Sequence, residues 1–296
     1  MKGWPKNDAN IILYFEMVLM SLFLIMNATD LQLQTLGAEY YTKAGSFPIS
    51  SFLLPVFENF SESSLILMER SAWWLHIIGI FIFLNYLYFS KHLHILLAFP
   101  NVYYGSVEAK GKFKNLESVT NEVKLMMDPS ADLFAAPAEG AEIPAKFGAS
   151  DVLDLSRTQL LNAYTCTECG RCTDNCPASQ TGKKLSPRKI MMDTRDRLEE
   201  IGKNIDTNGV FIPDNKQLLG DYITKEELWA CTTCNACVEA CPVSIDPLSI
   251  IMDMRQYLVM EQSAAPNELN IAMTNIENNG APWPYNQMDR LNWKNE

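Results

Sequence analysis

Histidine is scarce in this chain of 296 residues, since only His76, His92 and His94 occur. No cysteine lies outside two short motifs, so none remains for a structural disulfide. The formal net charge is −11 and no basic stripe occurs, which argues against nucleic acid as a partner, because phosphate recognition needs clustered Lys and Arg. Alternating polar and apolar runs long enough to indicate strands are also missing. We therefore expect a mainly α-helical fold.

Two apolar runs are present near the N-terminus. Residues 11–26 contain a single acid, Glu16, and residues 72–89 contain no formal charge. A membrane helix needs about 20 mostly apolar residues, so we expect two transmembrane helices, at about residues 10–30 and 72–99. The first reaches that length only if residues 28–33 continue it. A cleaved signal peptide for the first run, or two buried helices of a soluble protein, are the weaker alternatives.

The distribution of Lys and Arg predicts how these helices are oriented. Between the two runs only Lys43 and Arg70 are basic, whereas the flanking segments carry Lys2, Lys6, Lys91, Lys110, Lys112 and Lys114. By the positive-inside rule, both ends of this part face the cytoplasm. Grouped free cysteines also fit a reducing compartment. We therefore expect a multi-pass protein of the cytoplasmic membrane whose cysteine-bearing part lies in the cytoplasm.

Composition divides the chain into four parts. We expect a membrane part at 1–104, a linker at 105–149, a helical cysteine-bearing domain at 150–262, and a C-terminal helix and tail at 263–296. N-cap and proline signals within the domain predict four helices, which begin after Ser156, Ser186, Thr224 and Asp246. The second of these helices should end at Gly202.

Two segments each contain four cysteines in the pattern Cys-x-x-Cys-x-x-Cys-x-x-x-Cys-Pro. The first runs from Cys166 to Pro177 and the second from Cys231 to Pro242. This pattern is typical of [4Fe–4S] proteins, and in those with two clusters the fourth cysteine of each segment ligates the other cluster. We therefore predict two [4Fe–4S] clusters, one held by Cys166, Cys169, Cys172 and Cys241 and the other by Cys231, Cys234, Cys237 and Cys176. Structural zinc is the alternative, although it needs only four ligands, typically as two separated pairs.

Longer stretches around the motifs resemble a known family. They are KFGASDVLDLSRTQLLNAYTCTECGRCTDNCPASQTGKKLSPRKIMMDTRD, WACTTCNACVEACPVSIDPLSIIMDMRQ and NIENNGAPW, between Lys146 and Trp283. These segments resemble the iron–sulfur subunits of the heterodisulfide-reductase D-like family. The resemblance implies an alpha-helical ferredoxin domain that passes electrons to a cysteine-rich, CCG-type domain. It also implies a membrane part similar to the cytochrome b subunit of respiratory nitrate reductase.

Two departures from that family shape the partners that we expect. No cysteine follows Cys241, so we expect the CCG-type domain on a separate subunit. The membrane part has two candidate spans, whereas the related cytochromes have about five. A membrane cytochrome subunit, a quinone and membrane lipid are therefore further candidate partners. Trp283 and Tyr285 are candidate anchors for the CCG-type subunit, because aromatic residues carry much interface energy. The alternative is that both pack back onto the ferredoxin domain.

His76 and His94 are candidate ligands of haem b. They lie eighteen residues apart, which on one continuous helix is five turns and roughly 27 Å, close to the thickness of a bilayer core. This spacing resembles the last helix of a two-haem membrane cytochrome. The alternative is that His76 packs among aromatic side chains while His92 and His94 lie at the lipid headgroups. Glu16 is a candidate contact for a quinone or a proton, and the alternative is that it simply lies at the membrane interface.

Three functions are compatible with these patterns. The first is a membrane-anchored electron-transfer subunit, which relays electrons through two [4Fe–4S] clusters between a quinone or haem site and a cytosolic oxidoreductase partner. The second is a catalytic reductase subunit of a heterodisulfide-reductase-like or hydroxy-acid-oxidising complex. Because the sequence contains no CCG cysteines and no recognisable nucleophile–base pair, we expect no catalytic residue in this chain. The third is a purely structural scaffold, which would show no reversible one-electron signal.

Overall fold

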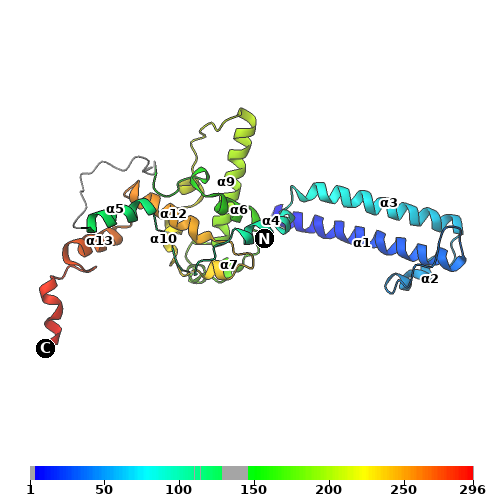
Figure 1. The fold of residues 1–296 in the computed structure, drawn as a ribbon, viewed down its shortest axis with the longest axis horizontal. Coiled ribbons are helices and arrows are strands. Elements are labelled where there is room, and N and C mark those ends of the chain that lie inside the picture. The colour runs from blue at the N-terminus through cyan, green and yellow to red at the C-terminus, as the bar shows by residue number, and fades with distance from the viewer. Residues whose placement is uncertain (1–3, 110, 114, 129–145, 296) are drawn as a thin grey trace. The chain divides into compact units, whose positions relative to one another are not determined.

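The computed structural model describes residues 4–109, 111–113, 115–128 and 146–295 (Figure 1). Within these residues the regular elements are helices, and the one β pairing is an isolated bridge between Leu219 and Ile223. The prediction of a mainly α-helical fold is therefore confirmed. The chain divides into two units, Met1–Ile95 and Leu96–Glu296.

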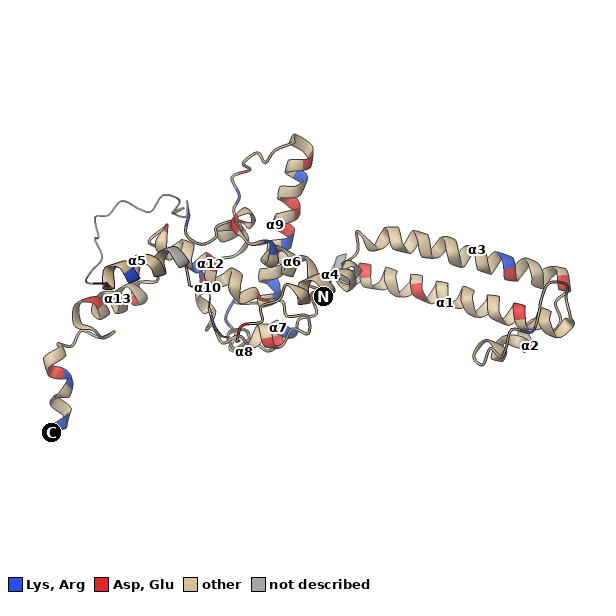
Figure 2. Cartoon of the chain, viewed as in Figure 1, with Lys and Arg blue, Asp and Glu red and all other residues tan. Residues whose placement is uncertain are grey.

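The first unit is a hairpin of two long helices, α1 (Trp4–Leu36) and α3 (Glu62–Leu87). The two helices lie side by side, and the connection between them contains η1 (Ser50–Leu53) and α2 (Leu54–Phe57) (Figure 1). Both long helices are long and apolar enough to cross a membrane. Figure 2 shows that charged residues are sparse along them. Residues 28–33 are helical, so the first apolar run reaches the length of a span.

Close packing between α1 and α3 depends on a small residue. A Cβ atom added at Gly79 would lie 2.6 Å from Cδ2 of Leu19, so the glycine allows the two helices to approach each other. Phe15 and Phe83 stack nearby with ring centroids 5.5 Å apart. Small residues at such contacts are typical of helices that associate within a membrane.

α3 covers a different range from the helix predicted at 72–99. It begins ten residues earlier and ends at Leu87, after which come η2 (Lys91–Leu93) and α4 (His94–Tyr103). The buried carboxylate of Asp8 stabilises this break, because it accepts hydrogen bonds from Tyr86 Oη at 2.6 Å and from Ser90 Oγ and the Lys91 backbone N–H at 3.1 Å. His76 and His94 therefore lie on different helices. The prediction that one continuous helix carries both was wrong.

The second unit is built from short and medium helices. They are α5 (Glu117–Met127), η3 (Val152–Asp154), α6 (Arg157–Thr165), α7 (Arg171–Asp174), α8 (Pro177–Gln180), α9 (Pro187–Asn208), η4 (Leu218–Tyr222), α10 (Lys225–Ala230), α11 (Ala236–Glu239), α12 (Pro247–Met260), α13 (Asn267–Asn279) and η5 (Gln287–Lys294). Residues 110, 114 and 129–145 of the predicted linker lie outside the described residues, and its described part contains the helix α5. Its end is packed, because Ala149 N–H donates to the Asp253 carbonyl at 3.0 Å.

The four predicted helix starts are confirmed. In each, the side chain of the N-cap residue accepts a hydrogen bond from the backbone N–H three residues later, as the caps Ser156, Ser186, Thr224 and Asp246 show. The predicted end of α9 was wrong. The helix continues through Gly202 and ends at Asn208; its C-cap, Gly209, has a φ of 78°, the left-handed conformation that closes many helices.

The cysteine-bearing part consists of two equivalent halves. In each half a capped helix (α6 or α10) ends at the first cysteine, a one-turn helix (α7 or α11) carries the third, and a longer helix (α9 or α12) begins with proline after its N-cap. The halves meet through equivalent elements, since α7 contacts α11 and α9 contacts α12. A shared apolar core holds them together, with fully buried side chains that include Ile190, Ile201, Leu228, Ile250, Ile251 and Met254.

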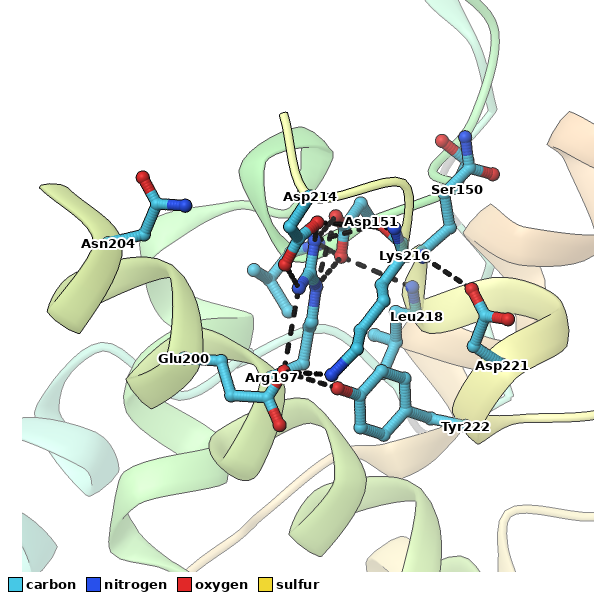
Figure 3. A network of polar contacts seen from close by, with 12 residues as sticks. Ser150, Asp151, Arg197, Glu200, Asn204, Asp214, Lys216, Leu218, Asp221 and Tyr222 are labelled. Carbon is cyan, nitrogen blue, oxygen red and sulfur yellow. Dashed lines mark hydrogen bonds and ion pairs between the residues drawn. The ribbon is translucent and has the colours of Figure 1, made fainter. Parts of the chain in front are cut away.

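A buried arginine joins distant segments of this unit (Figure 3). Arg197 on α9 is fully buried and donates to both carboxylate oxygens of Asp151 and of Asp214, and also to the Lys216 carbonyl at 2.8 Å. Hydrogen bonds from Arg197 lower the pKa of Asp214 to about 2. A buried charge needs such partners to offset its desolvation, so this network holds the chain after α9 against the start of the domain.

Candidate iron–sulfur centre

The two cysteine loops share one backbone conformation. Cys166 directly follows α6, and Cys231 directly follows α10. The residue before the second cysteine of each loop has a positive φ, 60° for Glu168 and 55° for Thr233. The residue after the second cysteine is also left-handed in both loops: Gly170 in the first and Asn235 in the second. Glycine and asparagine are the residues that adopt this conformation most readily.

These turns direct backbone N–H groups toward sulfur. In the second loop the Thr233 N–H donates to Cys231 Sγ at 3.4 Å. In the first loop, burial raises the pKa of Cys166. The equivalent N–H, that of Glu168, donates to the Cys166 sulfur and lowers this pKa by a smaller amount. Successive inward N–H groups in left-handed turns form concave anion-binding sites, which occur at many iron–sulfur centres. Both loops therefore have the backbone expected around an anionic cluster.

The first group of thiols combines cysteines from both motifs. Burial, together with smaller contributions from the nearby thiols of Cys172 and Cys241, raises the pKa of Cys166 to about 11. Burial also raises the pKa of Cys172, and Cys169 and Cys241 contribute in the same direction. Cys241 follows the second loop in the sequence but lies with the thiols of the first.

The second group mirrors the first. Burial raises the pKa of Cys231, and nearby charges on Cys176 and Cys234 add to this effect. Burial raises the pKa of Cys237 to about 12, with a contribution from Cys231. Cys176, the last cysteine of the first motif, therefore lies near the second loop. A smaller effect of Cys172 on Cys237 indicates that the two groups are close to each other.

The residues of both groups fit a cationic iron–sulfur core. A buried thiol of raised pKa stays protonated at neutral pH unless a bound metal ion displaces its proton. With its four thiolates such a cluster is anionic overall, and a guanidinium lies beside the first loop: a Cβ at Gly170 would be 3.8 Å from Arg188 Nη1, and Arg188 Nε is buried without a hydrogen-bond partner. Among the described residues, no group of three or more His, Cys, Asp or Glu side chains is found that could hold a single metal ion.

Two arginines contact the loops from equivalent places. Arg195 on α9 pairs with Glu168 inside the first loop, with Nη1 and Oε1 2.9 Å apart. Arg255 on α12 donates to the carbonyls of Leu228 and Cys231, each at 2.6 Å from Nη2, and lies over the Trp229 ring. Positive charge on Arg195 and on Arg255 lowers the pKa of Cys166 and of Cys231, respectively, although burial outweighs it in both.

The sequence analysis missed both arginines, although a signal was present. The start of α9 reads PRKIMMDTRD over residues 187–196, and the start of α12 reads PLSIIMDMRQ over residues 247–256. Aligning the two segments places Arg195 and Arg255 at the same position, nine residues after each N-cap. Comparison of the two halves with each other would therefore have identified them.

The other predicted site residues lie in different surroundings. His76 Nδ1 is 3.0 Å from the Leu19 carbonyl oxygen, and His94 Nδ1 is 2.8 Å from that of Lys91. His92 Nε2 lies 3.8 Å from a carboxylate oxygen of Glu16. Trp283 and Tyr285, which follow α13, are 54% and 63% exposed, so their rings are not packed into the core.

Comparison with known proteins agrees with this geometry. Residues 162–245 match the family model of the 4Fe-4S dicluster domain, so the chain contains a domain of this class. It is 31% identical to the probable iron-sulfur-binding oxidoreductase FadF of Bacillus subtilis, over 97% of this chain and 41% of that protein. It is 29% identical to EtfAB:quinone oxidoreductase of Syntrophomonas wolfei, over 97% of this chain and 40% of that protein. The chain thus spans about two fifths of the length of these relatives.

Further relatives extend the comparison. A probable membrane-anchored ferredoxin of Chromohalobacter salexigens is 31% identical over 55% of this chain and 26% of its own length. Heterodisulfide reductase subunits C and D of Methanosarcina species are also relatives. The resemblance found in the sequence is thereby confirmed: the relatives are iron–sulfur oxidoreductases and heterodisulfide reductase subunits. They support an iron–sulfur electron-transfer or oxidoreductase role for this chain.

Proposed function

We propose that this chain is a membrane-anchored electron-transfer subunit that relays electrons through two [4Fe–4S] clusters between a quinone or haem site and a cytosolic oxidoreductase partner. The observation that carries this proposal is the mixed composition of the two thiol groups, each with three cysteines of one loop and the last cysteine of the other motif. Crossed ligation of this kind occurs in two-cluster ferredoxins. When bound, the clusters accept and donate single electrons.

The protein would hold the two clusters close together. We propose Cys166, Cys169, Cys172 and Cys241 as ligands of one, and Cys231, Cys234, Cys237 and Cys176 as ligands of the other. The contact between α7 and α11 supports a short distance between them, because each of these helices carries the third cysteine of its loop. Cys169 and Cys234 are exposed, so each site has an edge near the surface through which a partner could exchange electrons.

The membrane part would serve as the anchor. We propose that α1 and α3 cross the cytoplasmic membrane and that the domain at 150–262 lies in the cytoplasm. The length and apolar composition of the two helices support a position in the membrane, and so does the relative named a membrane-anchored ferredoxin. The names of other relatives suggest assembly with further subunits and reduction of a quinone, and we extend both suggestions to this chain as part of the proposal.

A separate CCG-type cysteine-rich subunit is the electron partner that we favour, with Trp283 and Tyr285 as its anchors. Both rings are more than half exposed, and exposed aromatic side chains are frequent binding hot spots. Trp283→Ala should weaken co-purification of such a partner and leave the iron content unchanged. Full retention of the partner would refute this role for Trp283.

Haem b remains a prediction for the membrane part. His76 and His94 each direct Nδ1 to a backbone carbonyl, which leaves Nε2 as the candidate ligand atom. Because the described helix α1 offers no histidine, any bis-histidine site would need ligands from another helix. A reduced b-type absorption spectrum that His76→Ala diminishes would support ligation. An intact complex without that spectrum would refute it.

Iron analysis and electron paramagnetic resonance (EPR) test the proposed function directly. Protein purified without oxygen should contain about eight irons per chain, and its reduced form should show the signal of two interacting four-iron clusters. Half that iron, or stoichiometric zinc, would contradict the proposal. A reversible one-electron signal would also separate electron transfer from a purely structural role.

A further inference from the structure

Between the first and second cysteines, the two loops differ in charge at one pair of equivalent positions; after the second cysteine, the exposed Arg171 also corresponds to the neutral Ala236. The first loop reads Cys-Thr-Glu-Cys over residues 166–169, and the second reads Cys-Thr-Thr-Cys over residues 231–234. Glu168 in the first loop therefore corresponds to Thr233 in the second, and both residues have the same left-handed backbone conformation. Since the loops are built alike, exchange of an acid for a neutral residue changes the charge beside the cluster with little change in shape.

The arginine next to each loop makes this difference important. Arg195 pairs with Glu168, whose side chain is only 5% exposed, and also with the neighbouring Asp196 at 3.1 Å. At the positions equivalent to these two acids, the second half has Thr233 and Gln256, which are both neutral. The charge of Arg195 is therefore balanced by carboxylates.

Arg255 keeps an uncompensated charge. In the part of the chain that the structure describes, it makes no ion pair, and its contacts are the carbonyls of Leu228 and Cys231 and the face of Trp229, with its Cζ 4.9 Å from the ring centroid. These contacts fix the guanidinium against the backbone of the first cysteine of the second loop. Its positive charge is therefore held beside the backbone of the second loop.

We propose that Arg255 raises the reduction potential of the cluster bound by the second loop, whereas Glu168 opposes the equivalent effect of Arg195 at the first. This inference rests on the proposed function, since it requires two bound clusters. Reduction adds one electron, and so one negative charge, to a cluster that is already anionic with its four thiolates. A fixed cation nearby stabilises the reduced form more than the oxidised form and raises the potential. A neutral ion pair at the same distance has a much smaller effect.

The test is a redox titration of the full chain, purified in detergent without oxygen, reduced stepwise with dithionite and followed by EPR. Arg255→Met should shift one of the two midpoint potentials to a more negative value while the iron content stays at that of the wild type. Arg255→Lys should keep the wild-type midpoint, because it retains the charge although it lacks the planar guanidinium that bridges the two carbonyls. Failure of Lys to rescue would show that the role of Arg255 is structural and would overturn the proposal.

The first loop supplies the matched controls. Glu168→Gln removes one negative charge beside the first loop, although Arg195 keeps its pair with Asp196, and should shift the other midpoint to a more positive value. The double change Glu168→Gln with Arg195→Met removes one anion and one cation, so it should leave both midpoints near those of the wild type. If a midpoint potential of the double variant shifted as far as that of Arg255→Met, the proposal would be overturned.

Different experimental results would refute the proposed function and this inference. Wild-type protein without two clusters would refute the proposed function. If both clusters are intact and neither midpoint potential changes in Arg255→Met, the inference alone is refuted. If Arg255→Met loses iron, Glu168→Gln decides the matter, and the lack of a positive shift would overturn the inference.

Discussion

Arg197 and Asp214 form a two-point ion pair in which Nη1 lies 2.5 Å from Oδ2 and Nη2 lies 2.9 Å from Oδ1. The arginine is fully buried on α9, whereas Asp214 lies on the chain that follows the helix. Asp151 binds the same guanidinium from the start of the domain, and it also accepts the Leu218 N–H at 3.2 Å (Figure 3). One side chain thus joins three segments that are far apart in the sequence.

Arg197→Met should destabilise the second unit strongly. The change leaves Asp151 and Asp214 without their common cation, and removal of one member of a buried ion network typically costs about 3–5 kcal/mol. The measurement is the apparent unfolding temperature of the full chain at a fixed heating rate, together with limited proteolysis between α9 and α10. Lys216→Ala is the control, because the exposed pair of Lys216 with Glu200 at 3.4 Å should contribute below about 1 kcal/mol. Equal effects of the two changes would show that the buried network does not stabilise the unit.

Cys176→Ser should damage the cluster of the second loop more than that of the first. Although Cys176 follows the first loop directly, its charge acts on Cys231. We expect the variant to lose up to half of the iron and the EPR signal of the interacting pair. Cys241→Ser is the matched change, and it should affect the cluster of Cys166, Cys169 and Cys172. If each serine variant instead lost the cluster of its own motif, crossed ligation would be wrong.

Thiol labelling should distinguish the cysteines after iron is removed with a chelator. Cys169 and Cys234 are exposed, whereas burial raises the pKa of Cys166 from 9.0 to about 11. Only the thiolate reacts with iodoacetamide, and a rise of two units lowers its fraction at pH 8 about a hundredfold. Mass spectrometry should therefore find Cys169 and Cys234 alkylated well before Cys166 and Cys237. Equal rates at all eight cysteines would show that the two loops unfold when iron is absent.

Reporter fusions should determine the topology of the helical hairpin. A fusion after Lys114 is expected to report a cytoplasmic location, and a fusion between Gly45 and Ser50 a location outside the membrane. This outcome follows from the concentration of lysines at both ends of the hairpin and their rarity between the spans. The opposite pattern would refute the proposed orientation, and two cytoplasmic signals would refute the spans themselves.

The sequence alone was sufficient for features that depend on local chemistry. Four helix starts were predicted correctly because a capping side chain acts on a backbone N–H only three residues away, as in the pair Ser156 and Gln159. The cysteine pattern predicted an iron–sulfur dicluster domain because its spacing reflects ligand geometry within a single loop. The two apolar helices could likewise be recognised from length and composition.

Only the tertiary structure decided features that depend on contacts between distant segments. The break after Leu87 is stabilised by Asp8, about eighty residues earlier, whose carboxylate binds Ser90 and the Lys91 N–H. Ser90 also acts locally as the N-cap of η2, but neighbouring residues do not reveal the contact with Asp8. The network of Arg197 and the different surroundings of Arg195 and Arg255 likewise appear only once the helices are packed together. Local capping and ligand spacing act over a few residues, whereas ion pairs and electrostatic effects depend on distance in space, which the order of residues does not reveal.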